Sequence, residues 1–203
     1  MKIICIGRNY KEHVKELNNK LPDNPLFFLK PDTALLRNNN PFFIPEFSSE
    51  IHYEVELILK INRLGKTIQP KFAHRYFDSI GIGIDFTARD IQKQCIEKGL
   101  PWELAKAFDY SAAISKFLPK SNFSNLDEIS FRLDINGKSV QLGNTSKMIF
   151  SFDDIISYVS RFITFRTGDI IFSGTPAGVG PVKIGDRLQA YIEEKLMLDF
   201  FIK

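Results

Sequence analysis

The sequence lacks the features of several large protein classes. It contains two cysteines, Cys5 and Cys95, whose separation fits neither a disulfide framework nor a zinc knuckle, so both are expected to be buried thiols. No apolar run approaches the roughly 20 residues that a membrane helix needs, and no membrane partner is expected. The opening segment 1–7 is too short and ends too early for a signal peptide, which predicts a cytoplasmic location.

An excess of charge of one sign is also lacking. Lys and Arg total 27 against 24 Asp and Glu, and the basic residues are spread along the chain instead of forming a block. No nucleic-acid partner is therefore expected. The sequence has no internal repeat, low-complexity tract or Gly/Ser-rich linker, so residues 1–203 are predicted to form a single domain.

Phenylalanine and short apolar segments are abundant instead. The chain has 19 Phe residues and is 44% hydrophobic, which predicts a thick core packed with Phe. Asn136-Gly137 lies between alternating segments and predicts a two-residue hairpin turn. Eight apolar segments predict strands at 3–6, 26–29, 53–61, 80–86, 131–135, 169–172, 188–192 and 196–202.

Few helices are predicted, and two of them have a sequence signal for their start. Thr87 with Asp90, and Ser151 with Asp154, each have the spacing of a capping box. The expected helices cover 87–98, 153–162 and 10–17. Because the strands do not alternate regularly with helices, the fold class predicted is a β-rich α+β domain and not a doubly wound nucleotide fold.

Three carboxylates are candidates for a metal site. An extended strand would place Glu54 and Glu56 on one face; a solvated strand face is the ordinary explanation, but Ile58 shares that face and favours a cleft. Asp85 ends an apolar strand, and it is free of a helix-capping role because Thr87 can supply the cap. Without a His or Cys cluster beside them, these oxygens suit Mg²⁺ or Mn²⁺ better than zinc.

Basic side chains are expected beside such a centre. Three carboxylates with a divalent ion leave a formal charge of about −1, which an anionic substrate would have to overcome. Lys106, Lys30 and Arg8 are the candidates. Lys106 stands among apolar residues, and the alternative for it is a side chain that snorkels from a loop.

A histidine and a glycine-rich loop complete the candidates. His13 and Glu16 are three residues apart, so on a helix the carboxylate can orient the imidazole; the alternative is a surface pair. His52 and His74 receive no role. The loop 174–180 is not followed by Gly-Lys-Ser/Thr, so it predicts backbone N–H groups and the Thr175 hydroxyl facing a carboxylate, and no nucleotide site.

Taken in order, six segments resemble the fumarylacetoacetate hydrolase family along nearly the whole chain. They are Gly7-Arg8-Asn9-Tyr10 with His13 and Glu16, Phe28-Leu29-Lys30-Pro31, Glu54-x-Glu56, Asp85-Phe86-Thr87-Ala88-Arg89-Asp90, Lys106-Ala107-Phe108-Asp109, and the glycine loop from Gly174. The resemblance is to the compact acylpyruvase and oxaloacetate decarboxylase branch.

The resemblance implies a homodimer with a mixed β-sheet roll, and Mg²⁺ or Mn²⁺ held by Glu54, Glu56 and Asp85. It implies that His13 and Glu16 lie on a mobile lid formed by residues 8–24. The residues implied to act on the substrate or contact it are Lys106, Arg8, Lys30, Gln92 and Thr175.

The reaction implied is hydrolysis of the carbon–carbon bond of acylpyruvate-type 2,4-dioxo acids through a metal-bound enolate. His13, oriented by Glu16, would deprotonate the attacking water. The enzymatic alternatives are an oxaloacetate decarboxylase or tautomerase and a 2-hydroxyhepta-2,4-diene-1,7-dioate isomerase or decarboxylase. A metal-binding or oxo-acid-binding protein without turnover is the alternative from another class.

Overall fold

The computed structural model describes residues 1–18 and 20–203, and its largest element is a mixed eight-stranded sheet. The strand order is β2-β1-β12-β5-β6-β8-β3, with β9 beside β6. The pairs β1–β12 and β3–β8 are parallel, and the other pairs are antiparallel. The strands are β1 (Ile3–Gly7), β2 (Leu26–Lys30), β3 (Leu35–Leu36), β5 (Val55–Ile61), β6 (Phe77–Asp85), β8 (Ala112–Ile114), β9 (Leu118–Pro119) and β12 (Ile170–Phe172).

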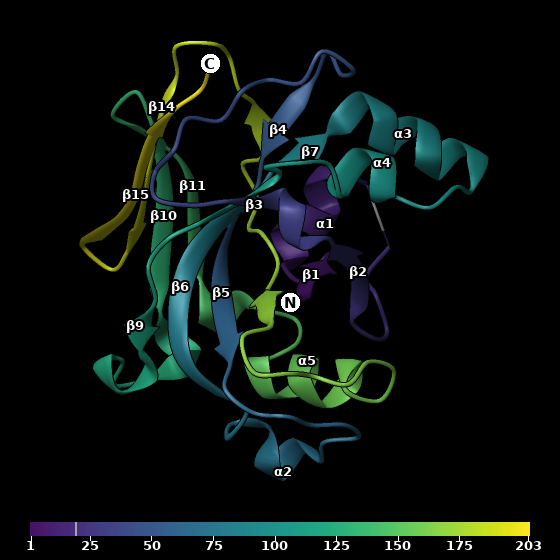
Figure 1. Ribbon diagram of the computed structural model, residues 1–203, viewed down its shortest axis with the longest axis vertical. Coiled ribbons are helices and arrows are strands. Elements are labelled where there is room, and N and C mark those ends of the chain that lie inside the picture. Colours follow the sequence, from purple (N-terminus) through teal and green to yellow (C-terminus); the bar gives the residue numbers. More distant parts are fainter. Residues whose placement is uncertain (19) are drawn as a thin grey trace.

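Two smaller sheets complete the roll. The antiparallel sheet β11-β10-β14-β15 packs across β5 and β6, so the two sheets enclose the core (Figure 1). The three-stranded sheet β13-β4-β7 lies at the end where β5 begins. These strands are β4 (Ile51–Tyr53), β7 (Thr87–Ala88), β10 (Ser130–Ile135), β11 (Lys138–Asn144), β13 (Gly180–Pro181), β14 (Arg187–Ile192) and β15 (Lys195–Phe201).

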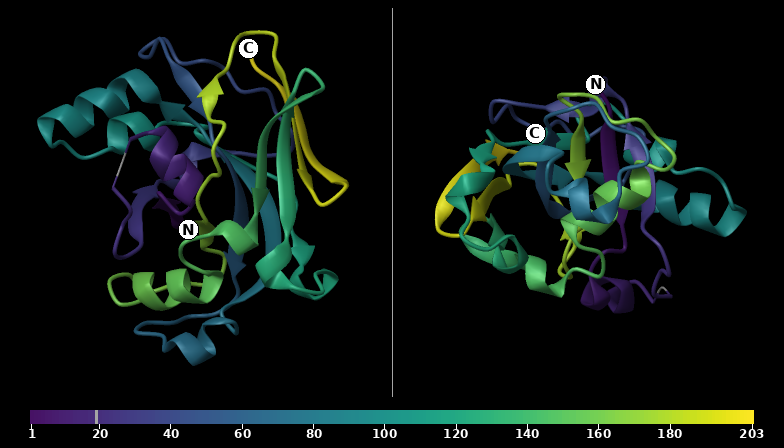
Figure 2. Two further views of the ribbon diagram at one scale, coloured as in Figure 1. Left: turned by 180° about the vertical axis from the view of Figure 1, so that it is seen from behind. Right: turned by 90° about the horizontal axis from the view of Figure 1, so that it is seen from below.

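Helices cover the two ends of the roll. α2 and α5 pack together at one end, and α3 with α4 lies toward the other (Figures 1 and 2). They are α1 (Lys11–Glu16), α2 (Pro70–Ala73), α3 (Arg89–Lys98), α4 (Glu103–Lys106) and α5 (Phe152–Val159), with single 3₁₀ turns at Asp32–Ala34, Lys120–Asn122, Leu126–Glu128 and Thr145–Lys147. No helix in the described residues is long and apolar enough to cross a membrane.

The eight predicted strands are all present, and so is the predicted Phe-rich core. Phe42, Phe77 and Phe165 are among the largest fully buried side chains. A smaller apolar cluster on the other face of the main sheet includes both Ile58 and Cys5. Asn136 and Gly137 turn the β10–β11 hairpin with positive φ at both residues, as a tight turn of this kind requires. The mixed sheet with few short helices confirms the predicted fold class.

Two details of the predicted helices are wrong. The Ser151–Asp154 capping box is present at the start of α5, but this helix ends at Val159 and leaves Phe162 54% exposed beyond it. Thr87 does not cap α3, because its hydroxyl donates to the Asp85 carbonyl and accepts a hydrogen bond from Lys106. The residue that was predicted to cap the helix therefore uses its hydroxyl in a contact with Lys106 instead.

Candidate active site

The three predicted carboxylates meet where β5 begins beside the end of β6. The Asp85 N–H donates to the Glu54 carbonyl over 2.8 Å, which fixes the two strand ends side by side. Glu54 lies in a break between β4 and β5, whereas the sequence predicted one continuous strand. Glu54, Glu56 and Asp85 each offer one oxygen, and these oxygens lie within 4.8 Å of one another.

All three carboxylates are buried, and the surroundings of Glu54 and Glu56 move the pKa values of these two residues in opposite directions. Burial and the neighbouring Asp85 and Glu54 raise the pKa of Glu56 well above its ordinary value. Burial would also raise the pKa of Glu54, but Lys106 and Arg89 outweigh it and hold that pKa well below its usual range. A compact, buried acidic cluster of this kind needs cations for its stability.

Lys106 supplies one of those cations at the centre of the cluster. Its ammonium donates hydrogen bonds to Glu54 Oε2 at 2.7 Å, Asp85 Oδ2 at 2.8 Å and Thr87 Oγ1 at 2.6 Å. Burial alone would lower the pKa of Lys106, but Asp85 and Glu54 raise it above its ordinary value. The side chain is thus a buried, charged partner of two carboxylates and does not snorkel toward solvent.

Lys30 lies on the far side of Asp85. Its ammonium is 2.7 Å from Asp85 Oδ1 and donates to the carbonyl and hydroxyl of Ser111 at 2.8 and 3.0 Å. The contact to Oδ1 is an ion pair without hydrogen-bond geometry, so among the described residues Oδ1 receives no hydrogen bond. Lys30 and Lys106 therefore approach opposite oxygens of Asp85.

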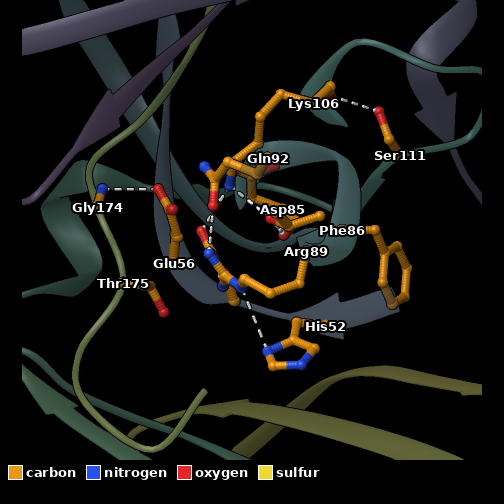
Figure 3. A network of polar contacts seen from close by, with 12 residues as sticks. His52, Glu56, Asp85, Phe86, Arg89, Gln92, Lys106, Ser111, Gly174 and Thr175 are labelled. Atoms are coloured by element: carbon orange, nitrogen blue, oxygen red, sulfur yellow. Dashed lines mark hydrogen bonds and ion pairs between the residues drawn. The ribbon is translucent and has the colours of Figure 1, made fainter. Parts of the chain in front are cut away.

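Arg89 is the third cation, and no role was predicted for it. Its guanidinium donates to Glu54 Oε1 and to Gln92 Oε1, and its Nε lies 3.4 Å from His52 Nδ1 (Figure 3). The available signal was its place three residues before Gln92 at the start of α3, which puts both side chains on one helix face. The three cations therefore pair with Glu54 and Asp85, and among the described residues none of them forms an ion pair with Glu56.

The donor set fits a divalent metal ion. All three candidate ligands are carboxylates, which Mg²⁺ and Mn²⁺ prefer, and one oxygen of each lies within 4.8 Å of the others. Burial and the negative charges of Asp85 and Glu54 raise the pKa of Glu56, and a bound cation would relieve the repulsion among these charges.

A cleft opens over the carboxylates. Eight of the ten side chains predicted for the site line it, namely Arg8, His13, Glu54, Glu56, Asp85, Gln92, Lys106 and Thr175. Phe28, Ile96 and Trp102 form an apolar part of its wall. The other two predicted residues lie outside the lining: Lys30 lies behind Asp85, and Glu16 lies behind His13.

His13 reaches the cleft from α1 with Glu16 as its support. His13 is 4% exposed, and its Nδ1 lies 3.0 Å from Glu16 Oε2. The other Glu16 oxygen accepts a hydrogen bond from the Gly178 N–H at 3.0 Å, so one carboxylate joins the imidazole to the glycine loop. The predicted i, i+3 pairing is present, and the alternative of an exposed surface pair does not describe the buried imidazole.

The glycine loop binds one of the carboxylates directly. The Gly174 N–H donates to Glu56 Oε2 at 2.6 Å. Gly174 has φ +104°, and an added Cβ would lie 2.6 Å from Asn9 Cβ, so only glycine fits here. The Thr175 hydroxyl donates to the Val55 carbonyl at 3.0 Å, so its proton is directed at the backbone.

Comparison with known proteins identifies the family. The model of the fumarylacetoacetate hydrolase C-terminal family matches residues 2–198. The chain is 41% identical over 201 residues to a protein of Bos taurus named oxaloacetate tautomerase FAHD1, mitochondrial, covering 99% of this chain and 91% of that protein. It is 42% identical over 192 residues to mitochondrial oxaloacetate decarboxylase of Dictyostelium discoideum, covering 94% and 88%.

A solved structure agrees with the fold. Fumarylpyruvate hydrolase from Pseudomonas aeruginosa, in complex with Mn²⁺ and pyruvate, has a TM-score of 0.94 and 33% identity, covering 100% of this chain and 89% of that chain. Together with the family model and the two relatives, this likeness confirms the resemblance of the six segments. The chain belongs to the fumarylacetoacetate hydrolase family.

Proposed function

We propose that the protein catalyses keto–enol tautomerisation of oxaloacetate or a similar small 2-oxo dicarboxylic acid with Mg²⁺ or Mn²⁺ as cofactor. The observation that carries the proposal is the buried triad of Glu54, Glu56 and Asp85 at the floor of a cleft that also holds His13. The names of the Bos taurus and Dictyostelium relatives support oxaloacetate as the substrate.

The charges of the cluster favour a doubly charged substrate. Lys30, Lys106 and Arg89 match the three carboxylates in formal charge, and their ion pairs are with Glu54 and Asp85. A divalent ion would therefore bring an excess of two positive charges into a buried site, and an oxaloacetate dianion would neutralise it. Arg8, which is half-buried and lines the cleft, is placed to contact the carboxylate remote from the metal.

The metal ion, when bound by Glu54, Glu56 and Asp85, would act as a Lewis acid that stabilises negative charge on the 2-oxo oxygen. His13 would take a proton from the carbon next to the keto group, as a general base whose ring Glu16 holds in place. Lys106 would hold the carboxylates of Glu54 and Asp85 in position through its hydrogen bonds.

Hydrolysis of an acylpyruvate is the second candidate. The His13–Glu16 pair would serve this reaction too, since the attacking water must be activated by a base. The likeness to fumarylpyruvate hydrolase supports it further. Decarboxylation of oxaloacetate would use the same charge stabilisation but no base, and the Dictyostelium relative is named for that reaction.

Purified protein should be assayed with Mn²⁺ or Mg²⁺ against oxaloacetate, acetylpyruvate and fumarylpyruvate. We expect metal-dependent loss of the enol absorbance of oxaloacetate with a higher kcat/KM than for hydrolysis of either acylpyruvate, and loss of all activity in a chelator. Faster hydrolysis would favour the second candidate, and no acceleration with any substrate would contradict both.

The lid and the location in the cell stay proposals. We propose that residues 8–24, which carry His13 and Glu16, close over the bound substrate; Asn19 of this segment lies outside the described residues. The cytoplasmic location predicted from the start of the sequence is kept as an expectation, and both curated relatives above are named as mitochondrial.

We also propose that the protein forms a homodimer through the apolar surface beside α4. A cavity of about 600 Å³ there is lined mainly by apolar side chains, among them Phe47, Leu104 and Phe108. Leu104 is 72% exposed, and a large exposed side chain within an apolar patch is typical of a protein–protein contact surface.

Light scattering at micromolar concentrations should give the mass of two chains. Leu104→Glu is expected to shift the mass toward one chain, because it places a charge in the proposed contact. Leu142→Glu is the matched control, since Leu142 on β11 is 71% exposed and should leave the dimer intact. A monomeric wild type would overturn this proposal.

A further inference from the structure

A closed ring of hydrogen bonds surrounds Val55, the residue between the two glutamates of the proposed metal site. The Val55 N–H donates to Gln141 Oε1 at 2.9 Å. The Val55 carbonyl accepts from the Thr175 hydroxyl at 3.0 Å, and that hydroxyl accepts from Gln141 Nε2 at 2.9 Å. All three contacts are buried.

The ring replaces a missing strand. β12 borders β5 only as far as Phe172, which is opposite Ile58, and beyond that point the chain leaves the sheet as the glycine loop. The N–H and carbonyl of Val55 on that side therefore have no strand partner, and a buried unpaired backbone group is costly. Gln141 and Thr175 satisfy both groups.

The two pinned groups belong to the two peptides that carry the metal ligands. The Val55 N–H is part of the peptide that joins Glu54 to Val55, and its carbonyl is part of the peptide that joins Val55 to Glu56. Gln141 also donates to the Pro176 carbonyl at 2.9 Å, which holds the glycine loop whose Gly174 N–H binds Glu56. The backbone that carries Glu54 and Glu56 is thus held in place by hydrogen bonds from Gln141 and Thr175.

Gln141 reaches this place from the second sheet through an irregularity in its strand. The β10–β11 register shifts so that Leu133 pairs with Gln141 but Asp134 pairs with Ser139, which leaves Val140 as an extra residue. A bulge of this type redirects a neighbouring side chain, and bulges occur often beside active sites. An added Cβ on Gly178 would lie 2.4 Å from the Val140 carbonyl oxygen, so the bulge and the glycine loop fit together closely.

We propose that Gln141 is a positioning residue for the metal centre, acting through the ring with Val55 and Thr175 to set the spacing of Glu54 and Glu56. The inference rests on the proposed metal-dependent function. Gln141 touches neither carboxylate, and its effect passes through the backbone that carries them. Residues that orient metal ligands in this way have a marked effect on metal affinity although they do not bind the ion.

Gln141→Leu removes the amide and keeps the size of the side chain. We expect the Mn²⁺ dissociation constant, measured by isothermal titration calorimetry, to rise by about 10- to 100-fold, as is typical when a residue supporting a ligand is lost. Gln189→Leu is the matched control, because Gln189 lies on β14 of the same sheet and its amide faces Asp199. Its Mn²⁺ affinity should equal that of the wild type.

Thr175 provides an independent test that does not depend on Gln141→Leu folding. Thr175→Val removes the hydroxyl from the ring and should weaken Mn²⁺ binding, whereas Thr175→Ser keeps the hydroxyl and should restore it. A protein that carries both Gln141→Leu and Thr175→Val should bind Mn²⁺ at least as tightly as the single variant with the lower affinity. The effects should not add, since either change opens the same ring.

Wild-type Mn²⁺ affinity in folded Gln141→Leu, or equal affinities in Thr175→Val and Thr175→Ser, would overturn the inference. A lower melting temperature with unchanged Mn²⁺ affinity would show a structural role only and would also overturn it. Wild-type protein that binds Mn²⁺ but does not convert oxaloacetate would contradict the proposed reaction, and the affinities would still decide the role of Gln141.

Discussion

Replacing Asp85 by Asn is expected to weaken Mn²⁺ binding by at least about 100-fold, beyond the 10- to 100-fold effect of losing a residue that only supports a ligand. Asp85 contributes one of the three clustered carboxylate oxygens. The amide has the same shape, but it removes a counter-charge from Lys30 and Lys106, so the fold of the variant must be measured beside its affinity. Turnover should fall with the affinity and recover in part at high Mn²⁺.

Calorimetric titration with Mn²⁺ and circular dichroism would check this result. Asp78→Asn is the matched control, because Asp78 lies on the same strand β6 but is exposed, where its carboxylate accepts a hydrogen bond from the Ser79 hydroxyl. It should bind Mn²⁺ like the wild type. A folded Asp85→Asn protein that keeps wild-type affinity and turnover would contradict the metal role of the carboxylate triad.

Replacing His13 by Ala is expected to separate the reactions that this site could support. Tautomerisation needs a base to remove a proton, and acylpyruvate hydrolysis needs a base to activate water, so both should fall by about 10² to 10⁴. Decarboxylation of oxaloacetate needs no base, because its electrons come from the breaking bond, and it should fall much less. Glu16→Gln should act in the same direction but more mildly, since Glu16 only orients the ring.

The measurement is kcat/KM for the three reactions at saturating Mn²⁺. His74→Ala is the control, because His74 is exposed and lies outside the cleft lining. Equal losses in all three reactions would mean that His13 acts in lid closure or substrate binding. Unchanged rates in His13→Ala would contradict its role as a base.

Local pattern was sufficient for several parts of the site. Alternation alone placed Glu54 and Glu56 on one face, and the structure has their oxygens together in spite of a break between β4 and β5. The i, i+3 spacing of His13 and Glu16 predicted their pairing on α1. These features depend on residues within one turn or one short strand, whose geometry is fixed by the backbone period.

Other parts of the structure could not be predicted, because the local pattern indicated one structure and the fold has another. Thr87 has the spacing of a helix cap, yet its hydroxyl is bound by Lys106 from a helix 19 residues away. Phe162 fits the apolar stripe of α5, yet the helix ends before it. For Thr87 a tertiary contact competed with the local preference and determined the outcome. For Phe162 the helix ended before the apolar pattern did.

The sequence by itself determined the fold class, the family and the chemical type of the site, because short periodic strands, capping residues and ordered motifs are local properties of the chain. Only the tertiary structure decided how the charges balance. It placed Lys30 and Lys106 on opposite oxygens of Asp85, and it brought Arg89 to Glu54. It also carried Gln141 across 86 residues to Val55, because a sheet that loses its neighbouring strand must satisfy its backbone from elsewhere in the fold.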